Sequence, residues 1–426
     1  MFFLYRFLTF LFFPLFIIII YIRIFLKKED TERYIEKIFV SKKTRLKDNK
    51  KNTLIWFHGA SIGEISSIFP LVSKLKKLNK NIKFLLTTVT LSSSKIVKDK
   101  YKNDPNISHQ FFPFDTSFLS RNFLKKWNPD LVGFIDSEIW PNFILEIKKK
   151  KIPLVLINGR ITKKTFNRWM IISFFAKKIF SSFDLCVSAN KDSVEYLRLL
   201  GATNIKSFGN LKFVSNTNTL PELNYENKLS LKNKEVWCAS STHKGEEQFC
   251  MRVHLEIKKT IPNILTVIVP RHIQRNNSIL LEAKKIGLVA QVFNENDRVN
   301  DNSEILLINS FGVLPKYYNI CKNIFMGKSL IEKLSKVGGQ NPIEASKLGC
   351  KIFHGPYVYN FKEVYMLLNS LNICEEIENE EVLAAKIVAS LKNPKKISQD
   401  KINKIEEFGN SILEKTTLEI KKIIKI

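Results

Sequence analysis

Short apolar runs alternate with stretches of helical spacing along most of this chain, and the alternation occurs in two separate series. Segments typical of buried strands are 54–58, 82–87, 131–135, 154–157 and 185–188 in the first series, and 235–239, 265–269, 304–308, 323–326 and 351–353 in the second. Strands that alternate with helices form parallel sheets covered by helices on both faces. The sequence therefore predicts two doubly wound, Rossmann-like α/β domains that face each other.

Changes in composition indicate the domain boundaries. Residues 214–234, an Asn-rich polar stretch with Pro221, are typical of a linker. We expect a first domain at 29–213, a second at 235–397, and a C-terminal helix over 398–426, where Lys, Glu and Ile recur with helical spacing. At 426 residues the chain is long enough for two domains that each have their own core.

The N-terminal region predicts contact with a membrane. Residues 7–26 are almost wholly apolar, and about twenty apolar residues are enough to cross a bilayer core. Pro14 is tolerable there, and Arg23 can extend to the interface. Basic residues between Lys27 and Lys51 follow, which by the positive-inside rule stay in the cytoplasm and can dock on anionic lipid, and no small-residue cleavage site is present. We expect 1–28 to be a single membrane anchor, spanning or lying in one leaflet, with the remaining chain on the cytoplasmic side.

The net charge of +28, from 68 Lys and Arg against 40 Asp and Glu, narrows the choice of partners. Nucleic acid, an anionic membrane or a polyanionic small substrate would each account for it, and so would a drift in composition. A nucleic-acid-binding protein would need a basic helix or a basic sheet studded with aromatic residues, and this chain shows neither. We therefore expect no nucleic-acid partner.

The spacing of the cysteines and histidines indicates whether the chain forms disulfides or binds a metal. The six cysteines show no close pairing, and most lie in apolar runs, which fits buried thiols in a reducing compartment. The six histidines show no zinc-binding spacing. The sequence gives no support for a metal site.

A strand that ends in a small-residue turn delivers the first candidate catalytic group. Residues 59–63 (Gly-Ala-Ser-Ile-Gly) separate the 54–58 strand from a helical stretch at 64–77, which Pro70 can kink. Glu64 would thus lie at the carboxyl end of a strand, where open α/β sheets bind ligands. The helix N-terminus favours its charged form, which suits a proton acceptor. The alternative is that Glu64 is a first-turn helix acid without a chemical role.

Two more acids are expected at the same edge of the first sheet. Asp136 and Glu138 follow the 131–135 strand in the segment Asp-Ser-Glu-Ile-Trp-Pro-Asn. They could merely cap the helix that Trp140-Pro141 begins. A cluster with Glu64 favours an active site instead.

Two basic residues follow other apolar stretches of the first series. Arg160 ends the segment Asn-Gly-Arg, and Lys212 lies in a Gly-Asn-Leu-Lys turn just before the expected linker. Single basic residues in so basic a chain are usually on the surface. The turn at Lys212 favours a place in the cleft.

The second series contains features suited to an anion. Ser241 and Thr242 lie in a hydroxyl-rich turn between a strand and a helix, where free backbone N–H groups can bind a phosphate. The same residues could form a plain capping box. Arg271 and His272 close the next strand, and Arg can bind a phosphate with two donors.

A glycine pair starts the last candidate binding segment. Gly338 and Gly339 precede a helix start with Glu344 in its first turn. Paired glycines allow a nucleotide to approach the backbone closely, and an acid one turn into the helix can accept a ribose hydroxyl. The glycine pair alone is a weak signal.

These segments, taken in order, resemble the 3-deoxy-D-manno-octulosonic acid (Kdo) transferases. Six segments carry the resemblance: Ser-Ile-Gly-Glu at 61–64, Glu-Ile-Trp-Pro-Asn at 138–142, Gly-Asn-Leu-Lys-Phe at 209–213, Ser-Thr-His-Lys-Gly-Glu-Glu at 241–247, Pro-Arg-His at 270–272 and Gly-Gln-Asn-Pro-Ile-Glu at 339–344. The resemblance implies a GT-B fold and an inverting enzyme at the inner membrane, which moves Kdo from CMP-Kdo to a lipid A precursor (lipid IVA) in lipopolysaccharide core synthesis.

The resemblance also implies roles for individual residues. Glu64 would be the general base, while Asp136, Glu138 and Lys212 would stabilise the transition state. The residues expected to bind CMP are Arg271, His272, Gly312, Val313, Leu314, Asn341, Pro342, Ile343 and Glu344, with Ser241, Thr242 and Arg160 as further donor or phosphate contacts. No cofactor or metal is implied, and the absence of an Asp-x-Asp segment agrees with that.

The chain departs from the family pattern at four places. Asp136 replaces the usual Glu, Lys328 lies within the usual Gly-Gly-Ser-Leu stretch, Gln340 replaces His and Val313 replaces Glu. These departures bear on the CMP contacts and on donor selectivity. The alternatives are a related membrane-associated GT-B transferase with another nucleotide-sugar donor, a nucleotide-sugar epimerase, and a membrane-tethered nucleic-acid-binding protein.

Overall fold

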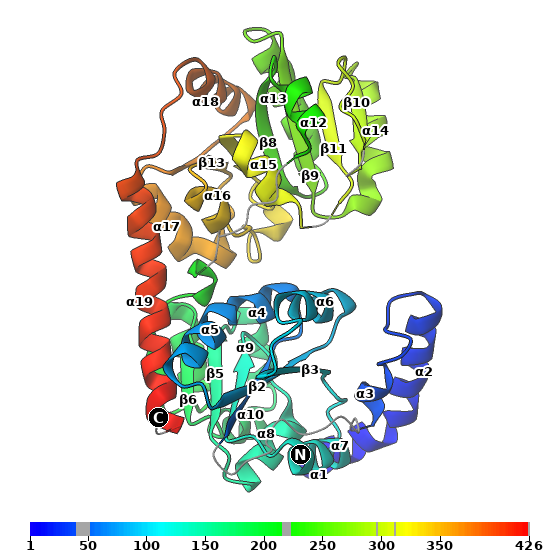
Figure 1. The fold of residues 1–426 in the computed structure, drawn as a ribbon, viewed down its shortest axis with the longest axis vertical. Helices are drawn as coiled ribbons and strands as arrows, with labels where there is room; N and C mark the ends of the chain where they lie inside the picture. The colour runs from blue at the N-terminus through cyan, green and yellow to red at the C-terminus, as the bar shows by residue number, and fades with distance from the viewer. Residues whose placement is uncertain (40–51, 215–222, 295–296, 311, 425–426) are drawn as a thin grey trace. The chain divides into compact units, whose positions relative to one another are not determined.

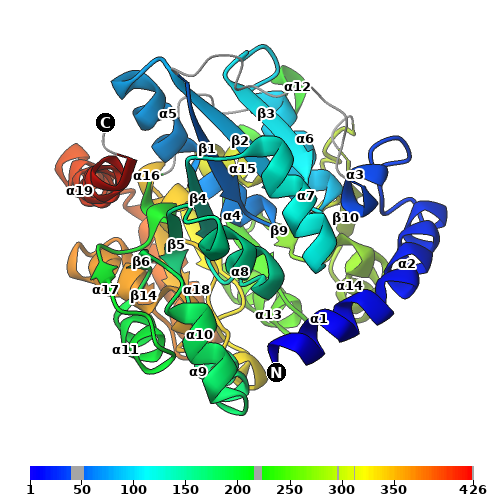
Figure 2. The same cartoon turned by 90° about the horizontal axis from the view of Figure 1, so that it is seen from below.

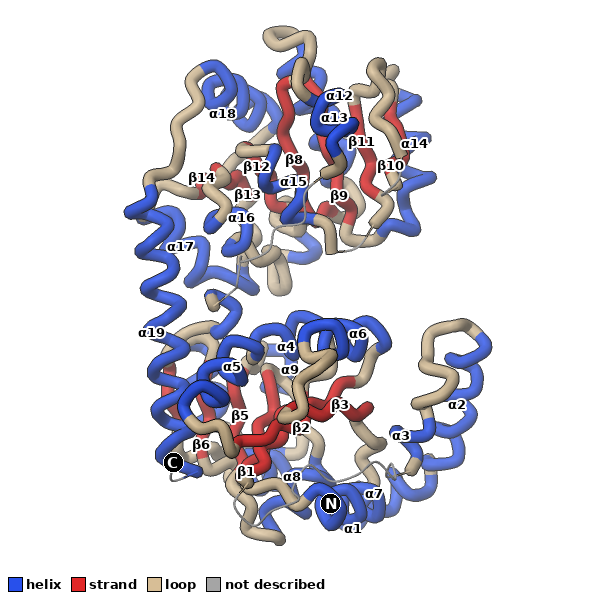
Figure 3. Tube along the Cα trace, viewed as in Figure 1, coloured by secondary structure: helices blue, strands red, loops and turns tan. Residues whose placement is uncertain are grey.

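The computed structural model describes residues 1–39, 52–214, 223–294, 297–310 and 312–424 (Figure 1). The chain divides into two compact units. Unit 1 contains Met1–Val214 and Phe408–Ile426, and unit 2 contains Ser215–Glu407. In each unit, strands form a sheet that is flanked by helices (Figure 3).

Unit 1 is built on a parallel seven-stranded sheet in the order β3-β2-β1-β4-β5-β6-β7. Its strands are β1 (Thr53–His58), β2 (Ile82–Thr88), β3 (Ile107–Phe111), β4 (Leu131–Ile135), β5 (Leu154–Gly159), β6 (Leu185–Ser188) and β7 (Ile205–Ser207). Its helices are α1 (Phe2–Leu11), α2 (Phe13–Phe25), α3 (Ile35–Ile38), α4 (Ile62–Ser67), α5 (Phe69–Leu78), α6 (Leu91–Lys100), α7 (Ser117–Trp127), α8 (Pro141–Lys149), α9 (Lys163–Met170), α10 (Ser173–Phe180), α11 (Lys191–Leu199) and η1 (Leu211–Phe213).

Unit 2 contains a second parallel seven-stranded sheet, in the order β10-β11-β9-β8-β12-β13-β14. Its strands are β8 (Glu235–Thr242), β9 (Ile264–Pro270), β10 (Ala290–Phe293), β11 (Ile305–Ile308), β12 (Asn323–Met326), β13 (Lys351–His354) and β14 (Cys374–Glu376). Its helices are α12 (Tyr225–Leu231), α13 (Glu246–Lys258), η2 (Ile273–Arg275), α14 (Asn276–Lys285), α15 (Leu314–Ile320), η3 (Glu332–Leu334), α16 (Ile343–Lys347), η4 (Tyr359–Phe361), α17 (Lys362–Ser370) and α18 (Glu380–Lys392). Helix α19 (Gln399–Ile424) begins in this unit, and its residues from Phe408 onward belong to unit 1.

The two sheets confirm the predicted α/β class, and the elements that differ have physical reasons. All ten expected strands are present, but the sequence did not indicate β3, β7, β10 and β14, which lie at or next to the sheet edges and are short or polar. The expected helix at 64–77 is divided at Ile68 into α4 and α5, because Pro70 cannot donate the backbone hydrogen bond that a continuous helix needs. The C-terminal helix is present as α19. Of the expected linker, 215–222 lie outside the described residues, and 225–231 form α12.

Aromatic residues fill one face of the first sheet. Trp56 on β1 is fully buried, and its ring lies 4.7 Å from Phe123, 5.6 Å from Phe134 and 5.6 Å from Phe143. These side chains come from β1, β4, α7 and α8, so the core fixes the two helices against the strands that carry the acids. Each fully buried aromatic side chain of this kind contributes a few kcal/mol to folding, because it removes a large apolar area from water.

The expected membrane anchor is not one helix. Among the described residues, no single helix is both long and apolar enough to cross a membrane, and α1 and α2 meet the length and composition requirements only as a pair bent by 46°. The break falls at Phe12, since Pro14 in the first turn of α2 disrupts the helix (Figure 2). Both helices carry exposed apolar side chains, including Phe3, Phe10 and Phe25.

Several basic residues expected to face lipid form interior contacts instead. Arg33 pairs with Glu36 at 2.8 Å, and Lys37 pairs with Glu29, all four with side chains at most 13% exposed. Arg23 also pairs with Glu29, at 2.9 Å, and does not extend away from the unit. The expected lipid-facing residues Lys42, Lys43, Arg45, Lys47, Lys50 and Lys51 lie outside the described residues.

Candidate active site

In each sheet the order of the strands reverses near the centre, at a topological switch point. The candidate residues lie at these two switch points. In unit 1 the break in order is between β1 and β4, and in unit 2 it is between β8 and β12. Ligands of open α/β sheets bind outside the carboxyl ends of the strands at such a point. Glu64 lies in the first turn of α4, just beyond β1, and Ser241 lies at the carboxyl end of β8 itself. Glu138 and Lys328 lie in the turns that follow β4 and β12.

Glu64 both caps a helix and lies at the predicted catalytic edge. Its Oε2 accepts hydrogen bonds from the backbone N–H groups of Ala60 at 2.7 Å and Ser61 at 3.1 Å, while Ser61 Oγ accepts from the Glu64 N–H at 3.4 Å. This is a complete capping box at the start of α4. The structural role considered from the sequence is therefore present, and it holds the carboxyl group at the end of β1.

The pKa of Glu64 is raised above its ordinary value. Burial is the largest cause, and the negative charge of Glu138 is the next, with a smaller contribution from Asp136. Hydrogen bonds from Ser61 act in the opposite direction but do not outweigh these causes. The sequence-based expectation that the helix N-terminus would favour the charged form was therefore wrong in its net direction, because it left out burial and the neighbouring acids.

Glu138 is held in its charged form next to Glu64. Its Oε2 accepts a hydrogen bond from Trp140 Nε1 at 2.8 Å and lies 3.2 Å from His58 Nε2. Burial acts to raise the pKa of Glu138, but the hydrogen bond and charge of His58 together with the Trp140 bond lower it below its ordinary value. Two neighbouring carboxyl groups thus have pKa values pushed in opposite directions, as in a site where one accepts a proton and the other stays ionised.

His58 is a site residue that sequence reasoning missed. It is the last residue of β1, its side chain is fully buried, and its ring is stacked on Phe112 with centroids 3.9 Å apart. Nδ1 lies 3.1 Å from the Thr87 carbonyl oxygen and 3.0 Å from its hydroxyl. The His58 ring is thereby fixed toward Glu138. Its position as the last residue of a strand beside the Glu64 turn was the available signal.

Asp136 and Lys212 form an ion pair at the same edge. Lys212 Nζ lies 3.0 Å from Asp136 Oδ2, with both side chains largely buried. Asp136 has a left-handed backbone with φ of 61°, and its carbonyl oxygen accepts from the Arg160 N–H at 3.1 Å. The structure thus brings the expected residues of unit 1 to one edge, with the Arg160 backbone beside Asp136.

A turn and a returning helix hold Lys212 in place. Asn158 Oδ1 accepts from the Leu211 N–H at 3.0 Å at the start of η1. Phe213, at the end of η1, packs against Phe408 of α19 with ring centroids 4.9 Å apart. Gly409 on α19 lies so close that an added Cβ would be 2.8 Å from the Phe213 carbonyl oxygen. The C-terminal helix therefore packs directly on the turn that carries Lys212.

In unit 2, one buried carboxylate joins the two central turns. Glu246 Oε2 accepts from the backbone N–H groups of His243 at 2.9 Å and Lys328 at 2.7 Å, and Oε1 accepts from Ser329 at 2.9 Å and Leu330 at 3.1 Å. Glu246 is 1% exposed, and burial raises its pKa although these four bonds act to lower it. The turn after β8 and the turn after β12 are thus fixed to each other.

Positive groups surround His243 at this edge. The pKa of His243 falls to about 4, first because the ring is buried and then because Lys328, His272 and Arg271 add positive charge, against a hydrogen bond to the Ser241 carbonyl oxygen. The His243 and His272 rings lie 5.7 Å apart. His243 and Lys328 were not among the expected binding residues, although their segments were. Lys328, Arg271 and His272 form a cationic cluster around the His243 ring, which the lowered pKa keeps neutral near pH 7.

Ser241 and Thr242 do not lie in a turn, as the sequence predicted, because β8 continues through Thr242, and both residues are buried. Ser241 has a left-handed backbone with φ of 56° and is 8% exposed. Thr242 is fully buried, and its hydroxyl has no hydrogen-bond partner within the described residues. Gly327 is required beside them, because an added Cβ would lie 2.7 Å from the Ser241 carbonyl oxygen.

The remaining expected CMP contacts cluster around α15 and α16, which pack against each other. Gly312, with φ of 76°, and Val313 lead into α15, whose first residue is Leu314. Asn341 Oδ1 accepts from the Ile343 N–H at 3.2 Å, Pro342 caps α16, and burial raises the pKa of Glu344. Across the described parts of the chain, no group of three His, Cys, Asp or Glu side chains is placed to hold a metal ion.

Comparison with known proteins decides the family. Residues 32–215 match the family model described as 3-deoxy-D-manno-octulosonic-acid transferase (kdotransferase). A 3-deoxy-D-manno-octulosonic acid transferase of Rickettsia bellii is 34% identical over 358 residues, which cover 83% of this chain and 82% of the relative. The chain belongs to the Kdo transferase family. It is therefore a glycosyltransferase, and Kdo transfer in lipopolysaccharide core synthesis is its reaction.

Solved structures bear on the fold of this Kdo transferase. A glycosyltransferase from Rickettsia africae has a TM-score of 0.59 at 15% identity, with 88% of this chain and 100% of that chain covered. A putative UDP-N-acetylglucosamine 2-epimerase from Listeria monocytogenes has a TM-score of 0.59 at 14% identity, with coverages of 88% and 97%. At these identities the likeness shows the fold alone, which resembles that of GT-B glycosyltransferases.

Proposed function

We propose that this Kdo transferase uses CMP-Kdo as donor and a lipid A precursor such as lipid IVA as acceptor, with Glu64 as the general base. The observation that carries the proposal is the raised pKa of the partly buried Glu64 carboxyl group next to an ionised Glu138. A base needs a pKa that lies closer to the working pH than that of an ordinary glutamate. Glu64 meets that requirement at the edge of the sheet where ligands bind.

The proposed reaction is a single displacement. The acceptor hydroxyl oxygen forms a bond to C2 of Kdo as the C2–O bond to the phosphate breaks. The electron pair of that bond leaves with CMP, and the acceptor proton moves to Glu64. Inversion at C2 follows from attack opposite the leaving group.

The cationic cluster of unit 2 supports the donor assignment. A nucleoside monophosphate that leaves with an added negative charge is stabilised by positive groups fixed near its oxygens. Arg271, His272 and Lys328 supply such groups around His243. One phosphate requires less neutralisation than a diphosphate, so we propose that these residues suffice without a metal ion, which activity in excess EDTA would test.

Nucleotide binding tests the donor assignment against a different nucleotide sugar. Calorimetric titration of the full-length protein with CMP and with UDP should show tighter binding of CMP. The fold is shared with a protein named as an epimerase of a UDP-sugar, so UDP is the informative competitor. Binding of UDP as tight as that of CMP would contradict the donor assignment.

The neighbouring acid gives a pH prediction. Replacing Glu138 with Gln removes a negative charge that raises the pKa of Glu64. Glu64 would then remain ionised at lower pH, so the acid limb of the pH profile of kcat/KM should move to lower pH. Trp140→Phe is the matched control, because it removes a hydrogen bond to Glu138 but leaves its charge. An acid limb that stays in place or moves to higher pH in Glu138→Gln would show that the two carboxyl groups are not coupled.

We further propose that unit 1 rests on the cytoplasmic face of the inner membrane, with α1 and α2 lying in one leaflet. Helices of 10 and 13 residues are roughly 15 and 20 Å long, shorter than the bilayer core of about 30 Å. Side-chain contacts tie α1 to the unit, since Phe2 packs on Phe175 of α10 at 4.6 Å and Arg6 pairs with Glu146 of α8 at 2.8 Å. Ile171 and Phe174, next to that contact, are 83% and 76% exposed.

Vesicle binding tests the membrane proposal. The double variant Ile171→Asp with Phe174→Asp should lower the fraction of full-length protein bound to phosphatidylglycerol-containing vesicles at least threefold, because it places charges on an exposed apolar surface. Leu281→Asp with Met366→Asp, two exposed apolar residues of unit 2, is the matched control. Equal losses in the two double variants would contradict a specific docking face.

A further inference from the structure

Helix α1 contacts a buried acid that holds the start of α8. Tyr5 donates its hydroxyl hydrogen to Asp115 Oδ2 at 2.7 Å. The same Asp115 carboxylate accepts from the backbone N–H groups of Asn142 at 3.1 Å and Phe143 at 3.0 Å. These are free N–H groups of the first turn of α8, so Asp115 stabilises the helix end, and Tyr5 completes its hydrogen bonding.

Asp115 depends on these donors to remain ionised. Burial raises its pKa to about 6, although hydrogen bonds from Tyr5, Asn142 and Phe143 and the charge of Arg6 act to lower it. Loss of the Tyr5 hydroxyl removes one of those donors. The carboxylate that fixes the start of α8 would then be held less firmly in its charged form.

The start of α8 is in turn joined to Glu138. Trp140 is the residue that caps α8, directly before Pro141, and its indole N–H donates to Glu138 Oε2 at 2.8 Å. A shift of the first turn of α8 therefore moves the donor that holds Glu138 against His58. Helix α1 and Glu138 are connected through Tyr5, Asp115 and the Trp140 turn.

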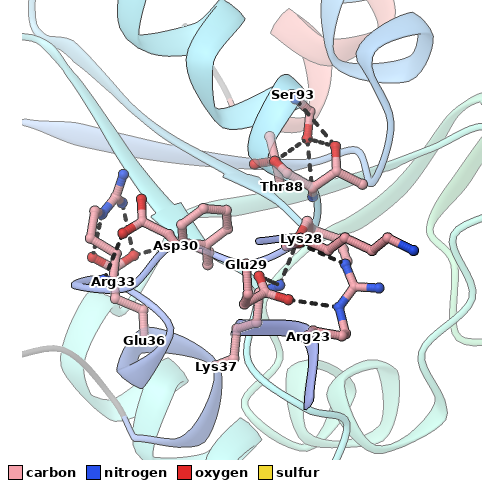
Figure 4. Close-up of polar contacts among 12 residues, drawn as sticks. Arg23, Lys28, Glu29, Asp30, Arg33, Glu36, Lys37, Thr88 and Ser93 are labelled. Atoms are coloured by element: carbon pink, nitrogen blue, oxygen red, sulfur yellow. Dashed lines mark hydrogen bonds and ion pairs between the residues drawn. The ribbon is translucent and has the colours of Figure 1, made fainter. Parts of the chain in front are cut away.

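The other end of the helix pair, at the end of α2, is connected to the segment that follows β2. Arg23 at the end of α2 donates from Nε to Glu29 Oε2 at 2.9 Å, and Glu29 pairs with Lys37 (Figure 4). Glu29 and Lys37 are 4% and 5% exposed. Lys37 Nζ then donates to the Val89 carbonyl oxygen at 2.8 Å, just beyond the end of β2.

Val89 lies next to the turn that holds Glu64. The Ala60 carbonyl oxygen accepts from the Val89 N–H at 3.4 Å and from Ser93 Oγ at 3.1 Å. The Ala60 N–H donates to Glu64 Oε2 at 2.7 Å. The second connection thus runs from Arg23 to Glu64 through hydrogen-bonded residues of unit 1.

We propose that the apolar α1–α2 pair is a positioning element for the two catalytic carboxylates, so that its docking on a lipid surface sets the geometry of Glu64 and Glu138. The inference rests on the proposed roles of these two acids. Its lipid part follows from the apolar side chains Phe3, Phe10 and Phe25, which are 83%, 67% and 86% exposed among the described residues. Tyr5, Asp115 and Lys37 act as positioning residues.

Hydrogen exchange of the full-length protein tests the connection without any assay of transfer. Binding to phosphatidylglycerol vesicles should slow exchange at the Ala60–Glu64 and Asn142–Phe143 amides at least threefold. Tyr5→Phe should abolish this effect at Asn142 and Phe143 only, whereas Tyr21→Phe, which alters an exposed tyrosine of α2, should preserve it at both places. Unchanged exchange at both turns on vesicle binding would overturn the proposal.

Kinetics supply the second test. Tyr5→Phe should lower kcat about three- to tenfold with KM for CMP-Kdo unchanged. Lys37→Met should also lower kcat, in contrast with Lys28→Met, whose lysine side chain is exposed. The decisive comparison is a double-mutant cycle, which isolates the coupling between two residues: in a Glu138→Gln background, Tyr5→Phe should have little further effect.

The outcomes separate this proposal from the function proposed above. Equal effects of Tyr5→Phe in the wild-type and Glu138→Gln backgrounds would overturn the positioning role, because Tyr5 would then not act through Glu138. Absence of transfer by the wild type would instead overturn the proposed substrates. The hydrogen-exchange result would still decide the positioning claim in that case.

Discussion

Glu64→Gln is expected to lower kcat for Kdo transfer by about 10²–10⁴-fold, the range contributed by a general base. Gln cannot accept the acceptor proton, but it can accept the Ala60 N–H in the capping box as Glu does. The substitution therefore removes the base and keeps the helix start. The measurement is single-turnover transfer at saturating donor, with CMP affinity and thermal unfolding recorded on the same protein.

The outcome distinguishes the two roles of Glu64. Ser61→Ala is the matched control, because it removes the other half of the capping box and leaves the carboxyl group. It should cost stability, typically about 1 kcal/mol, with a much smaller loss of kcat. If Glu64→Gln retained a third or more of the wild-type rate, Glu64 would be a capping residue only.

Glu246→Gln is expected to weaken CMP binding at least tenfold and to destabilise the protein by about 2–4 kcal/mol. The Glu246 carboxylate accepts four backbone N–H groups with two oxygens. A glutamine offers one oxygen and places an NH₂ group against two of those donors, and each buried unsatisfied donor costs about 1–3 kcal/mol. The turns that carry His243 and Lys328 would then separate.

A neighbouring buried acid provides the control for Glu246. Glu247 is fully buried and binds Arg275 with two hydrogen bonds, of 2.8 and 3.1 Å, and neither of these bonds involves the turns that carry His243 and Lys328. Glu247→Gln should therefore cost stability while leaving CMP affinity within about threefold of the wild type. A parallel loss of CMP affinity in both variants would mean that Glu246 acts through overall stability and not through the two turns.

The sequence predicted the parts of this fold that depend on local pattern. Apolar runs such as 131–135 identified the central strands, and Pro70 identified the break between α4 and α5. The family resemblance located the candidate site segments of each unit, because catalytic segments keep their order along the chain. The edge strand β14 could not be found this way, since Cys-Glu-Glu has no apolar pattern and is a strand only because β13 pairs with it.

Properties that arise from contacts between residues far apart in the chain could not be predicted from the sequence. The raised pKa of Glu64 depends on Glu138, and the lowered pKa of Glu138 depends on His58, 80 positions away. Arg33 and Lys37 looked like lipid-facing charges but pair inside the unit, because Glu29 and Glu36 lie within reach of them. Charge counts along a sequence do not include such pairing.

The measurement that tests the central claim most directly is transfer by the full-length protein from CMP-Kdo to a tetraacyl lipid A precursor in phospholipid vesicles with excess EDTA. Wild type and Glu64→Gln should be compared at equal concentration. The account predicts a Kdo-bearing lipid from the wild type and at least a hundredfold less from Glu64→Gln. Absence of product from a wild-type protein that binds CMP, or equal product from the two proteins, would contradict it.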